Sequence, residues 1–585
     1  MKVILTTLNA KYTHSSLALR YLKGYCGTIC DIEIKEFSIN HNILDILSQI
    51  FESKPDVVAF ACYIWNIEMT TKLVNLVKKV LPNVIIVCGG PEVTYQSDCF
   101  LSENPKVDYI VLGEGEETFY QVINKLKMGE TIGNLPALTY YNQANELVKG
   151  SALVVKDLNT IPFPYHDKDM IGLQDKIIYY ESSRGCPFSC QYCLSSATQG
   201  VRFFAVERVL EELSFFIRHN VRQVKFVDRT FNAKKNHYME IFKFLVKQQC
   251  KTNFHFEIAA DLLDDEVLDV LELMPSGRIQ LEIGVQSTNA VTLNKICRKN
   301  DWNKISYNVT RILQMHTIHL HLDLIIGLPN EDYQSFQTSF NDVYSLKPHM
   351  LQIGFLKLLK GSGIRQNQKQ HGYVYMDTAP YQVLANRYMS YHEIKNLHVM
   401  EEVFEQYYNS GRFRNSTQLL IDSNGGNAFL FYEKLTEYWQ KRNLHLVAHK
   451  TKSLYQYLYE FCQEMHPEKM QILKEILKFD ALLSDKASIR PEFLEWNEKY
   501  NKTISDFWRE QGAEKYIDGY KFTTWRDIKK NYHIEIFSFD ILAFIKKRVF
   551  ILKNCPVLFS FTEDETSYLL IEEQAFLQGE VENVI

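Results

Sequence analysis

Residues 1–130 alternate short apolar runs with amphipathic stretches. The apolar runs, which we predict to be strands, are residues 2–8, 56–62, 84–88 and 109–112. Because they contain little polar alternation, they are typical of strands that a parallel sheet buries on both faces. Between them, the segment 68–81 repeats apolar residues at helical spacing. Strands that alternate with helices predict an α/β fold with a doubly wound, Rossmann-like sheet.

The pattern changes twice along the rest of the chain. Residues 131–175 carry little periodicity and are predicted to be a linker with a small strand pair. The alternation of strands and helices then restarts, which predicts a partial (β/α) barrel over residues 176–365. After it, amphipathic helical patterns dominate residues 366–585, and Ser390 with Glu393 forms a capping box. We therefore predict a mainly helical C-terminal domain.

Composition narrows the class of protein. With 585 residues, 46% of them hydrophobic and 23% charged, the chain is expected to form several globular domains. A net charge of −5 gives no bulk electrostatic reason to bind nucleic acid, although a local basic patch stays open. The N-terminal apolar run is too short for a signal peptide, and no run of about eighteen apolar residues predicts a membrane span. We therefore expect a cytoplasmic protein with no membrane partner.

Three cysteines with a distinctive spacing carry the candidate chemistry. Cys186, Cys190 and Cys193 form a Cys-x3-Cys-x2-Cys run directly after a predicted strand. A zinc site usually takes four ligands in Cys-x2-Cys pairs, and the sequence has no second pair. A four-iron cluster with three cysteine ligands keeps one iron open for a cofactor or substrate. The spacing therefore predicts a [4Fe-4S] cluster, and the other nine of the twelve cysteines are expected to be reduced and scattered.

The cysteine spacing resembles the signature of radical S-adenosylmethionine (SAM) enzymes. In that family the open iron binds SAM and cleaves it to a 5′-deoxyadenosyl radical. Upstream, the Gly-Gly-Pro-Glu and Gly-Glu-Gly-Glu-Glu turns resemble the cobalamin-binding domain of B12-dependent radical SAM enzymes, and residues 366–585 resemble an uncharacterised domain on one branch of them. The resemblance implies cobalamin contacts from Thr7, Asn9, Tyr63, Trp65, Gly89, Gly90, Pro91, Glu92, Gly113, Glu114 and Gly115.

The same resemblance implies which residues contact SAM. Tyr192 resembles the aromatic residue that packs on the adenine, and polar groups follow the later barrel strands. Acceptors are needed for the ribose hydroxyls and the amino group, and an arginine suits the carboxylate. For each polar group the alternative is a buried, hydrogen-bonded structural residue. The expected SAM contacts are Tyr192, Asp228, Glu282, Gln286, Arg298 and Asp323.

One departure from other cobalamin folds concerns the cobalt ligand. The Asp-x-His-x-x-Gly motif, which supplies an axial histidine in those folds, is missing. His14 is the nearby histidine in the loop after the first strand, and capping or solvent exposure is favoured over cobalt ligation. We therefore predict a lower cobalt face without a protein nitrogen, covered by the loop 63–66.

The resemblance implies a cobalamin-dependent radical SAM methyltransferase. The radical would take a hydrogen atom from an unactivated carbon, and the substrate radical would collect the methyl group of methylcobalamin. One alternative is a cobalamin-assisted radical rearrangement or ring contraction without methyl transfer. Another is a non-catalytic B12 or redox sensor, against which the intact cysteine motif argues. A small molecule, a peptide or a modified RNA base are all open as the substrate, and flavodoxin or ferredoxin is expected as the electron donor.

The C-terminal third is expected to assist this reaction. Its aromatic-rich amphipathic helices suit a cap over the barrel mouth, which would exclude water while a radical exists. The alternative is a packing or dimerisation domain. Lysines and arginines gather in several short runs, such as Lys546-Lys547-Arg548. These runs leave open a phosphate-bearing substrate, although charge runs are more often solvated faces.

Overall fold

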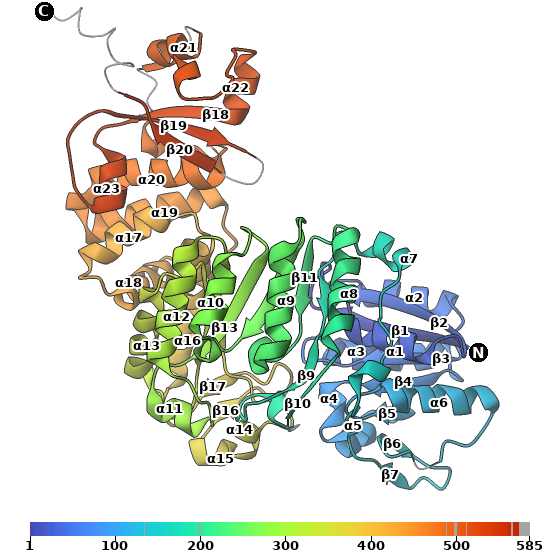
Figure 1. Cartoon of the computed structure of the whole chain (residues 1–585). Helices are drawn as coiled ribbons and strands as arrows, with labels where there is room; N and C mark the ends of the chain where they lie inside the picture. Colours follow the sequence, from blue (N-terminus) through green and yellow to red (C-terminus); the bar gives the residue numbers. More distant parts are fainter. Residues whose placement is uncertain are drawn as a thin grey trace, which may run out of the picture. The chain divides into compact units, whose positions relative to one another are not determined.

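The chain folds into two compact units, residues 1–394 and 395–585, which are described separately. The structure is a computed structural model (Figure 1). It describes residues 1–133, 135–197, 200–486, 488–496, 500–509, 512–562 and 566–572.

The first unit begins with a seven-stranded sheet in the order β2-β1-β3-β4-β5-β6-β7. Strands β1 to β5 pair in parallel, and β6 and β7 extend the edge in antiparallel fashion. The bounds are β1 (Lys2–Asn9), β2 (Asp31–Ser38), β3 (Val57–Ala61), β4 (Ile85–Gly89), β5 (Tyr109–Val111), β6 (Leu138–Tyr141) and β7 (Leu147–Lys149). The four predicted strands and the predicted strand pair are confirmed, and β2 is an addition.

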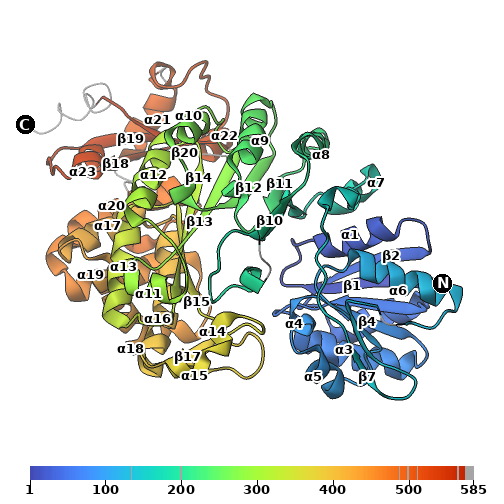
Figure 2. The same ribbon diagram turned by 60° about the horizontal axis from the view of Figure 1, so that its bottom comes forward.

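Helices cover both faces of this sheet. Val3 and Leu5 of β1 share a buried core with α1 (Leu17–Cys26) and α6 (Glu116–Met128). Their neighbours on the opposite face share a core with α2 (Ile43–Glu52), α3 (Ile67–Val80) and α5 (Ser97–Glu103). Figure 2 shows α1 and α3 on opposite sides of the sheet. Burial on both faces explains why these strands are apolar throughout, and it confirms the doubly wound fold.

A six-stranded parallel sheet follows, in the order β15-β14-β13-β12-β11-β8. Because neighbours in the sheet are successive in the chain, the strands form a partial (β/α) barrel with β8 and β15 at its edges. The strands are β8 (Ile178–Tyr180), β11 (Gln223–Phe226), β12 (Asn253–Ile258), β13 (Ile279–Gln286), β14 (His319–Ile326) and β15 (Met350–Phe355). The main connecting helices are α8 (Val206–Arg218), α9 (Lys235–Lys247), α10 (Asp265–Glu272), α11 (Ala290–Lys295), α12 (Trp302–Met315) and α13 (Tyr333–Ser345).

The two faces of the barrel strands differ in polarity. Along β13, Ile279, Leu281, Ile283 and Val285 are buried, whereas the residues between them are only half-buried. Strand β14 alternates in the same way, with His321 and Asp323 among its half-buried positions. Since side chains alternate across a strand, one face forms the apolar core and the other carries polar groups that remain accessible. The polar face is therefore the one available to a ligand.

Residues 366–394 belong to the first unit rather than to the second. Tyr373 donates a hydrogen bond to the carbonyl of Gly327 at 3.0 Å, and Val383 N–H donates to the carbonyl of Leu356 at 2.9 Å. Both Tyr373 and Val383 are buried. The predicted domain boundary follows residue 365, whereas the first compact unit ends at Ile394. The difference arises because residues 366–394 pack against the barrel.

The second unit combines helices with a small sheet. Ser390 and Glu393 exchange the hydrogen bonds of the predicted capping box, at 2.7 and 3.3 Å, where α16 (Tyr391–Phe404) begins. Pro467 lies at a break between two of the helices that follow. The later helices are α17 (Arg414–Ser423), α18 (Ala428–Lys441), α19 (Thr451–Met465) and α20 (Met470–Asp485). An antiparallel sheet follows, formed by β18 (Tyr532–Phe537), β19 (Cys555–Phe561) and β20 (Thr566–Leu570).

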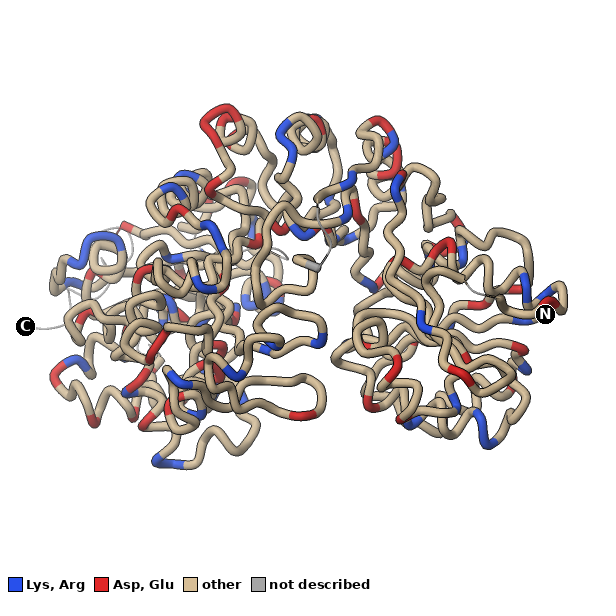
Figure 3. The backbone as a smooth tube through the Cα atoms, turned by 90° about the horizontal axis from the view of Figure 1, so that it is seen from below, with Lys and Arg blue, Asp and Glu red and all other residues tan. Residues whose placement is uncertain are grey.

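Charged residues of both signs are interspersed along each unit (Figure 3). Over the described residues, neither unit thus gains a bulk charge that would favour nucleic acid. No helix in the described part of the chain is long and apolar enough to span a bilayer.

Candidate active site

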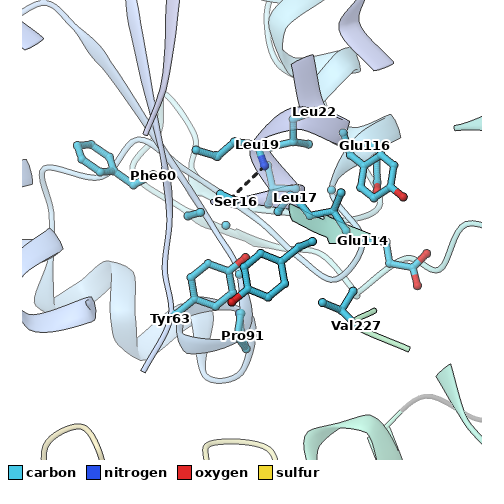
Figure 4. A pocket seen from close by; sticks show the side chains of 18 of the residues that line it. Ser16, Leu17, Leu19, Leu22, Phe60, Tyr63, Pro91, Glu114, Glu116 and Val227 are labelled. Carbon is cyan, nitrogen blue, oxygen red and sulfur yellow. Dashed lines mark hydrogen bonds between the residues drawn. The ribbon is translucent and has the colours of Figure 1, made fainter. Parts of the chain in front are cut away.

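A cavity of about 730 Å³ lies in the first unit between its two parallel sheets. One wall consists of the turns that follow β1, β3, β4 and β5, and the other comes from β8, β11 and β12. Figure 4 shows Tyr63, Pro91 and Glu114 of the first wall with Val227 of the second. Ligands of parallel α/β folds bind at the carboxyl ends of the strands. The cavity therefore lies where either sheet would hold a ligand.

Most of the residues expected to contact cobalamin line this cavity, although contact itself remains a prediction. Thr7 and Glu92 are the two that do not line it. The Thr7 hydroxyl donates to the carbonyl of Ala61 at 3.2 Å, and Glu92 accepts a hydrogen bond from Tyr381 at 2.7 Å. Both are buried and serve the packing of the chain itself. The lining members of the set are Asn9, Tyr63, Trp65, Gly89, Gly90, Pro91, Gly113, Glu114 and Gly115.

The glycines in these turns differ in whether the backbone requires glycine at their position. Gly90 has φ +111°, and a Cβ atom there would lie 2.5 Å from the carbonyl oxygen of Cys62. Gly113 has φ +70° and would bring a Cβ atom within 2.7 Å of the Leu153 oxygen. Gly115 has room, since its nearest side-chain atoms would be 3.5 Å away. Packing of the chain itself thus requires glycine at Gly90 and Gly113, whereas Gly115 is open to a small substitution.

The loop predicted to cover the lower cobalt face is held rigidly. The rings of Tyr63 and Trp65 stack at 4.5 Å with planes 7° apart. Trp65 Nε1 donates to the carbonyl of Leu8 at 3.1 Å, and Asn66 donates to the carbonyls of Leu8 and Ala61. Trp65 is still 45% exposed. The stacked rings of Tyr63 and Trp65, with Trp65 partly exposed, fit the flat corrin ring of cobalamin at this wall of the cavity.

His14 is placed in the cavity wall rather than in solvent. Its Nδ1 atom is 2.6 Å from the Tyr179 hydroxyl, and the two rings stack at 5.9 Å. Burial and the charges of Lys11 and Lys225 lower the pKa of His14. The histidine is thus held by the second sheet through Tyr179, and whether it ligates cobalt stays a prediction.

A buried ion-pair network joins the two walls of the cavity. Arg184 lies 2.6 Å from Glu116, 2.7 Å from Glu181 and 3.5 Å from Glu114. Arg202 binds Glu114 at 2.5 Å. Glu114 and Glu116 flank the Gly115 turn, whereas Arg184 and Arg202 pair across β9 (Ser183–Cys186) and β10 (Gly200–Phe203). Burial raises the pKa of Glu181 to about 7 even though Arg184 opposes it.

The cysteine loop begins at the end of β9. The Sγ atom of Cys186 lies 3.4 Å from the Thr230 hydroxyl, and Cys193 Sγ accepts a hydrogen bond from the Ser195 N–H at 3.4 Å. Among the described residues, no three His, Cys, Asp or Glu side chains lie close enough to share one metal ion. A four-iron cluster spans more widely, because each cysteine binds a different iron. Cys186, Cys190 and Cys193 thus stay the predicted ligands of a four-iron cluster.

Several of the predicted SAM residues gather next to this loop. Arg298 Nη1 donates to Cys190 Sγ at 3.7 Å and to the Tyr192 hydroxyl at 3.1 Å, and its Nη2 donates to the carbonyl of Gly284. Gln286, which has φ +71°, folds back beside Gly284. A Cβ atom at Gly284 would lie 2.1 Å from the Nε2 atom of Gln286.

Buried polar atoms near the cysteines lack partners. Arg298 Nε, Gln286 Oε1 and Asp323 Oδ1 find no hydrogen bond among the described residues. Burial and the nearby carboxylates of Glu282 and Glu257 raise the pKa of Asp323 well above its usual value. Unsatisfied buried donors and acceptors are costly and occur where a ligand is missing. Their mixed character fits a zwitterionic ligand such as SAM.

The remaining two predicted SAM residues have partners within the chain. Glu282 lies 2.8 Å from His255 Nε2 and 3.2 Å from Lys225 Nζ. Burial alone would raise its pKa, but these two partners lower the pKa of Glu282 to about 2. Asp228 is fully buried and accepts hydrogen bonds from the Ser182 N–H at 2.9 Å and the Ser183 hydroxyl at 2.5 Å. Asp228 therefore braces the segment that leads into the cysteine loop.

The sequence reasoning did not single out several residues that line the cavity. All of them except Glu116 and Arg184 lie in β8, β11 or β12 or shortly after these strands. The alternation of apolar and polar residues could have indicated which residues of β11 and β12 face the cavity. The ion pairs of Arg184 join residues that are distant in the sequence, so no local pattern predicts them. The missed residues are Glu116, Tyr179, Glu181, Arg184, Lys225, Arg229 and Glu257.

Comparison with protein families assigns all three parts of the chain. Residues 3–123 match the B12 binding domain, and residues 180–343 match the radical SAM superfamily. Residues 369–559 match a protein family of unknown function, DUF4080. The solved structure of the cobalamin-dependent SAM radical enzyme OxsB with aqua-cobalamin bound superposes with a TM-score of 0.59 at 15% identity, covering 86% of this chain and 84% of OxsB.

Two curated relatives come from different reaction classes. The cobalamin-dependent radical SAM methyltransferase TokK of Streptomyces tokunonensis is 28% identical over 350 residues, which cover 55% of this chain and 49% of TokK. The anaerobic magnesium-protoporphyrin IX monomethyl ester cyclase of Rubrivivax gelatinosus is 22% identical over 347 residues, covering 56% of this chain and 62% of the cyclase. The match thus spans about half the length of TokK. The chain belongs to the radical SAM proteins that carry an N-terminal B12-binding domain, and it ends in a DUF4080 domain.

Proposed function

We propose that this chain is a cobalamin-dependent radical SAM methyltransferase that acts on an unactivated carbon. One observation carries the proposal. The cavity of about 730 Å³ has the candidate cobalamin turns on one wall and the polar face of the radical SAM barrel on the other. The motif cysteines and the predicted SAM residues lie outside the lining of this cavity. The cysteine loop adjoins the cavity through Thr230, which follows the lining residue Arg229 and lies 3.4 Å from Cys186 Sγ, so a substrate held here would lie against the cobalamin turns and next to that loop. The similarity to TokK supports methyl transfer as the outcome.

The residues of the chain have distinct roles in this proposal. Cys186, Cys190 and Cys193 would hold the [4Fe-4S] cluster, and the unsatisfied atoms of Arg298 and Asp323 would bind SAM beside it. The turns after β1, β3, β4 and β5 would hold cobalamin. When bound, the cluster with SAM supplies hydrogen abstraction and cobalamin supplies the methyl group. The protein itself orients these groups and excludes water from the cavity.

Isotope-labelled SAM tests this function directly. The protein is reconstituted with iron, sulfide and hydroxocobalamin, reduced, and given SAM with a deuterated methyl group together with a small-molecule extract from cells that lack it. We expect 5′-deoxyadenosine and a product that carries the deuterated methyl group. The matched control is the variant with alanine at all three motif cysteines, which should form neither. Formation of neither by the wild-type protein would contradict the proposal.

A second candidate is radical cyclisation or rearrangement without methyl transfer. The similarity to the Rubrivivax gelatinosus cyclase favours it, because that relative, similar over 347 residues, is named a cyclase and not a methyltransferase. The same experiment separates the two. Formation of 5′-deoxyadenosine with a changed substrate that contains no deuterium would favour the second function.

The surroundings of the reaction are part of the proposal. An oxygen-sensitive cluster suits a reducing compartment such as the cytoplasm. A low-potential donor such as flavodoxin or ferredoxin would reduce the cluster. The substrate would be a small molecule, a peptide or a modified RNA base.

A further inference from the structure

Arg229 occupies a distinctive position in the cavity wall. It follows β11, and Lys225, Val227 and Arg229 all line the cavity, because alternate positions of an extended chain face the same side. The side chain of Arg229 is exposed to this space. The next residue, Thr230, contacts Cys186 Sγ at 3.4 Å. Arg229 is thus placed at the end of the cavity that adjoins the cysteine loop.

The other cations of the cavity wall are already neutralised. Arg184 is paired with Glu116 at 2.6 Å and Glu181 at 2.7 Å, and Lys225 is paired with Glu282 at 3.2 Å. Arg229 makes no side-chain hydrogen bond and no ion pair within 4.0 Å to any described residue. The positive charge of Arg229 acts to lower the pKa of two groups that line the same cavity, Tyr63 and Glu257, against the larger effect of burial.

We propose that Arg229 binds an anionic group, a carboxylate or a phosphate, of the substrate. The proposal rests on the proposed function, since it places the substrate in this cavity. A guanidinium offers a planar fork that matches both oxyanions bidentately. Tyr63 belongs to the wall of the first sheet and Thr230 adjoins the cysteine loop, so an anion held by Arg229 would lie between the two cofactor sites.

Glu257 is compatible with this role. Its carboxyl faces the same cavity, and a charged carboxylate beside the anion would oppose binding. Burial, followed by the neighbouring Glu282, raises the pKa of Glu257 to about 7. Near neutral pH a substantial fraction of the Glu257 carboxyl is therefore protonated, and this form donates a hydrogen bond to an oxyanion instead of repelling it.

Chemical labelling tests the anion site without turnover. The reconstituted protein is treated with phenylglyoxal, which modifies accessible guanidinium groups, and the modified arginines are identified by peptide mass spectrometry. We expect Arg229 to react faster than Arg184, the matched control in the same cavity with three carboxylate neighbours. Inorganic phosphate or acetate should slow modification of Arg229 by about tenfold at saturation, beyond the effect of sodium chloride at equal ionic strength. Protection by phosphate alone would identify a phosphate, and protection by acetate a carboxylate.

Two labelling results would overturn the proposal. Equal protection by sodium chloride would mean that Arg229 is an ordinary solvated cation. Protection by SAM or cobalamin alone would assign it to a cofactor. Because labelling needs no turnover, a wild-type protein that forms no 5′-deoxyadenosine would contradict the proposed function and leave this test decisive for Arg229.

Turnover of the holoenzyme provides the second test. R229Q should lower kcat/KM for the substrate about 100-fold, and R229K should restore part of it, because a lysine keeps the charge without the fork. Substrate-independent formation of 5′-deoxyadenosine and the corrin absorbance should be retained. R222Q, at the other end of β11, is the matched control and should match wild type. An R229Q protein with unchanged kcat/KM, or a product that carries no anionic group, would overturn the proposal.

Discussion

The Nη1 atom of Arg298 donates a hydrogen bond to the sulfur of Cys190 across 3.7 Å, although 108 residues separate them in the sequence. Burial raises the pKa of the Cys190 thiol, and the charge and hydrogen bond of Arg298 act in the opposite direction. Iron binds the thiolate form of cysteine. The contact therefore prepares the central cysteine of the motif for cluster binding and places a guanidinium beside the predicted SAM site.

Replacing Arg298 with glutamine should affect both functions of this contact. We expect the KM for SAM to rise about tenfold to 100-fold, because a charge-assisted hydrogen bond is lost. The reduction potential of the cluster should fall, since a positive charge next to it is removed. Steady-state kinetics and an EPR-monitored redox titration measure the two effects. Lys299→Gln, at the exposed next residue, is the control. An unchanged KM and potential would show that Arg298 only packs the loop.

Gly115→Leu should fill part of the cavity without disturbing the turn. A Cβ atom at Gly115 makes only ordinary contacts at 3.5 Å, so a longer side chain is expected to extend into the space assigned to cobalamin. Corrin absorbance after reconstitution should drop at least about tenfold, and iron content should stay at the wild-type level. Gly115→Ala is the matched control and should keep cobalamin. Wild-type corrin absorbance in Gly115→Leu would contradict this assignment of the cavity.

Gly90 is unsuitable for the same experiment. Its strained φ of +111° and its 2.5 Å approach to the Cys62 oxygen mean that any side chain disrupts the turn itself.

Removing Arg184 should destabilise the first unit in a pH-dependent manner. Arg184→Met leaves Glu116 and Glu181 buried without their cation, which typically costs about 3–5 kcal/mol. Burial already raises the pKa of Glu181 to about 7, and loss of Arg184 raises it further. A carboxyl whose folded pKa exceeds its unfolded value loses stability as pH rises. Thermal unfolding should therefore show a larger deficit above pH 7 than below it.

Arg202→Met provides the comparison for that measurement. Arg202 pairs with Glu114 alone and is more exposed than Arg184, so its loss should lower the melting temperature less. Equal effects of the two substitutions at all pH values would contradict a special role for the Arg184 network.

The place of truncation should decide whether the first unit survives alone, because the DUF4080 match at residues 369–559 begins inside this unit. A protein that ends at residue 394 keeps Tyr373, Tyr381 and Val383, which are buried against the barrel and the first sheet. It should be soluble, bind cluster and cobalamin, and fail to turn over substrate if the C-terminal domain completes the site. A protein that ends at residue 369 should be insoluble. Full product formation by the 1–394 protein would show that residues 395–585 are an accessory module.

The sequence located most strands but not the contacts between them. The apolar runs of β1, β3, β4 and β5 are buried on both faces and stand out, whereas β2 alternates charged and apolar residues at the sheet edge and was overlooked. The cysteine motif is local, so its spacing could be recognised. The pairing of Glu282 with His255 and Lys225 depends on the register of three strands, which no local pattern reveals.

Asp228 illustrates the same limit within the candidate site. It closely follows the barrel strand β11, yet its carboxylate is fully buried and accepts hydrogen bonds from Ser182 and Ser183. A strand-end position alone does not separate a ligand contact from an internal brace. The partners of Asp228 became evident only from the packed structure.

The central claim is that cobalamin in the cavity and the cluster on the adjoining cysteine loop lie close to each other. The most direct test is EPR of the holoenzyme with bound cob(II)alamin, before and after reduction of the cluster. We predict that the reduced cluster, being paramagnetic, broadens the cob(II)alamin signal and speeds its relaxation. The control is the variant with alanine at Cys186, Cys190 and Cys193, in which reduction should leave the signal unchanged. Identical relaxation in the reduced wild-type protein and this variant would contradict this closeness.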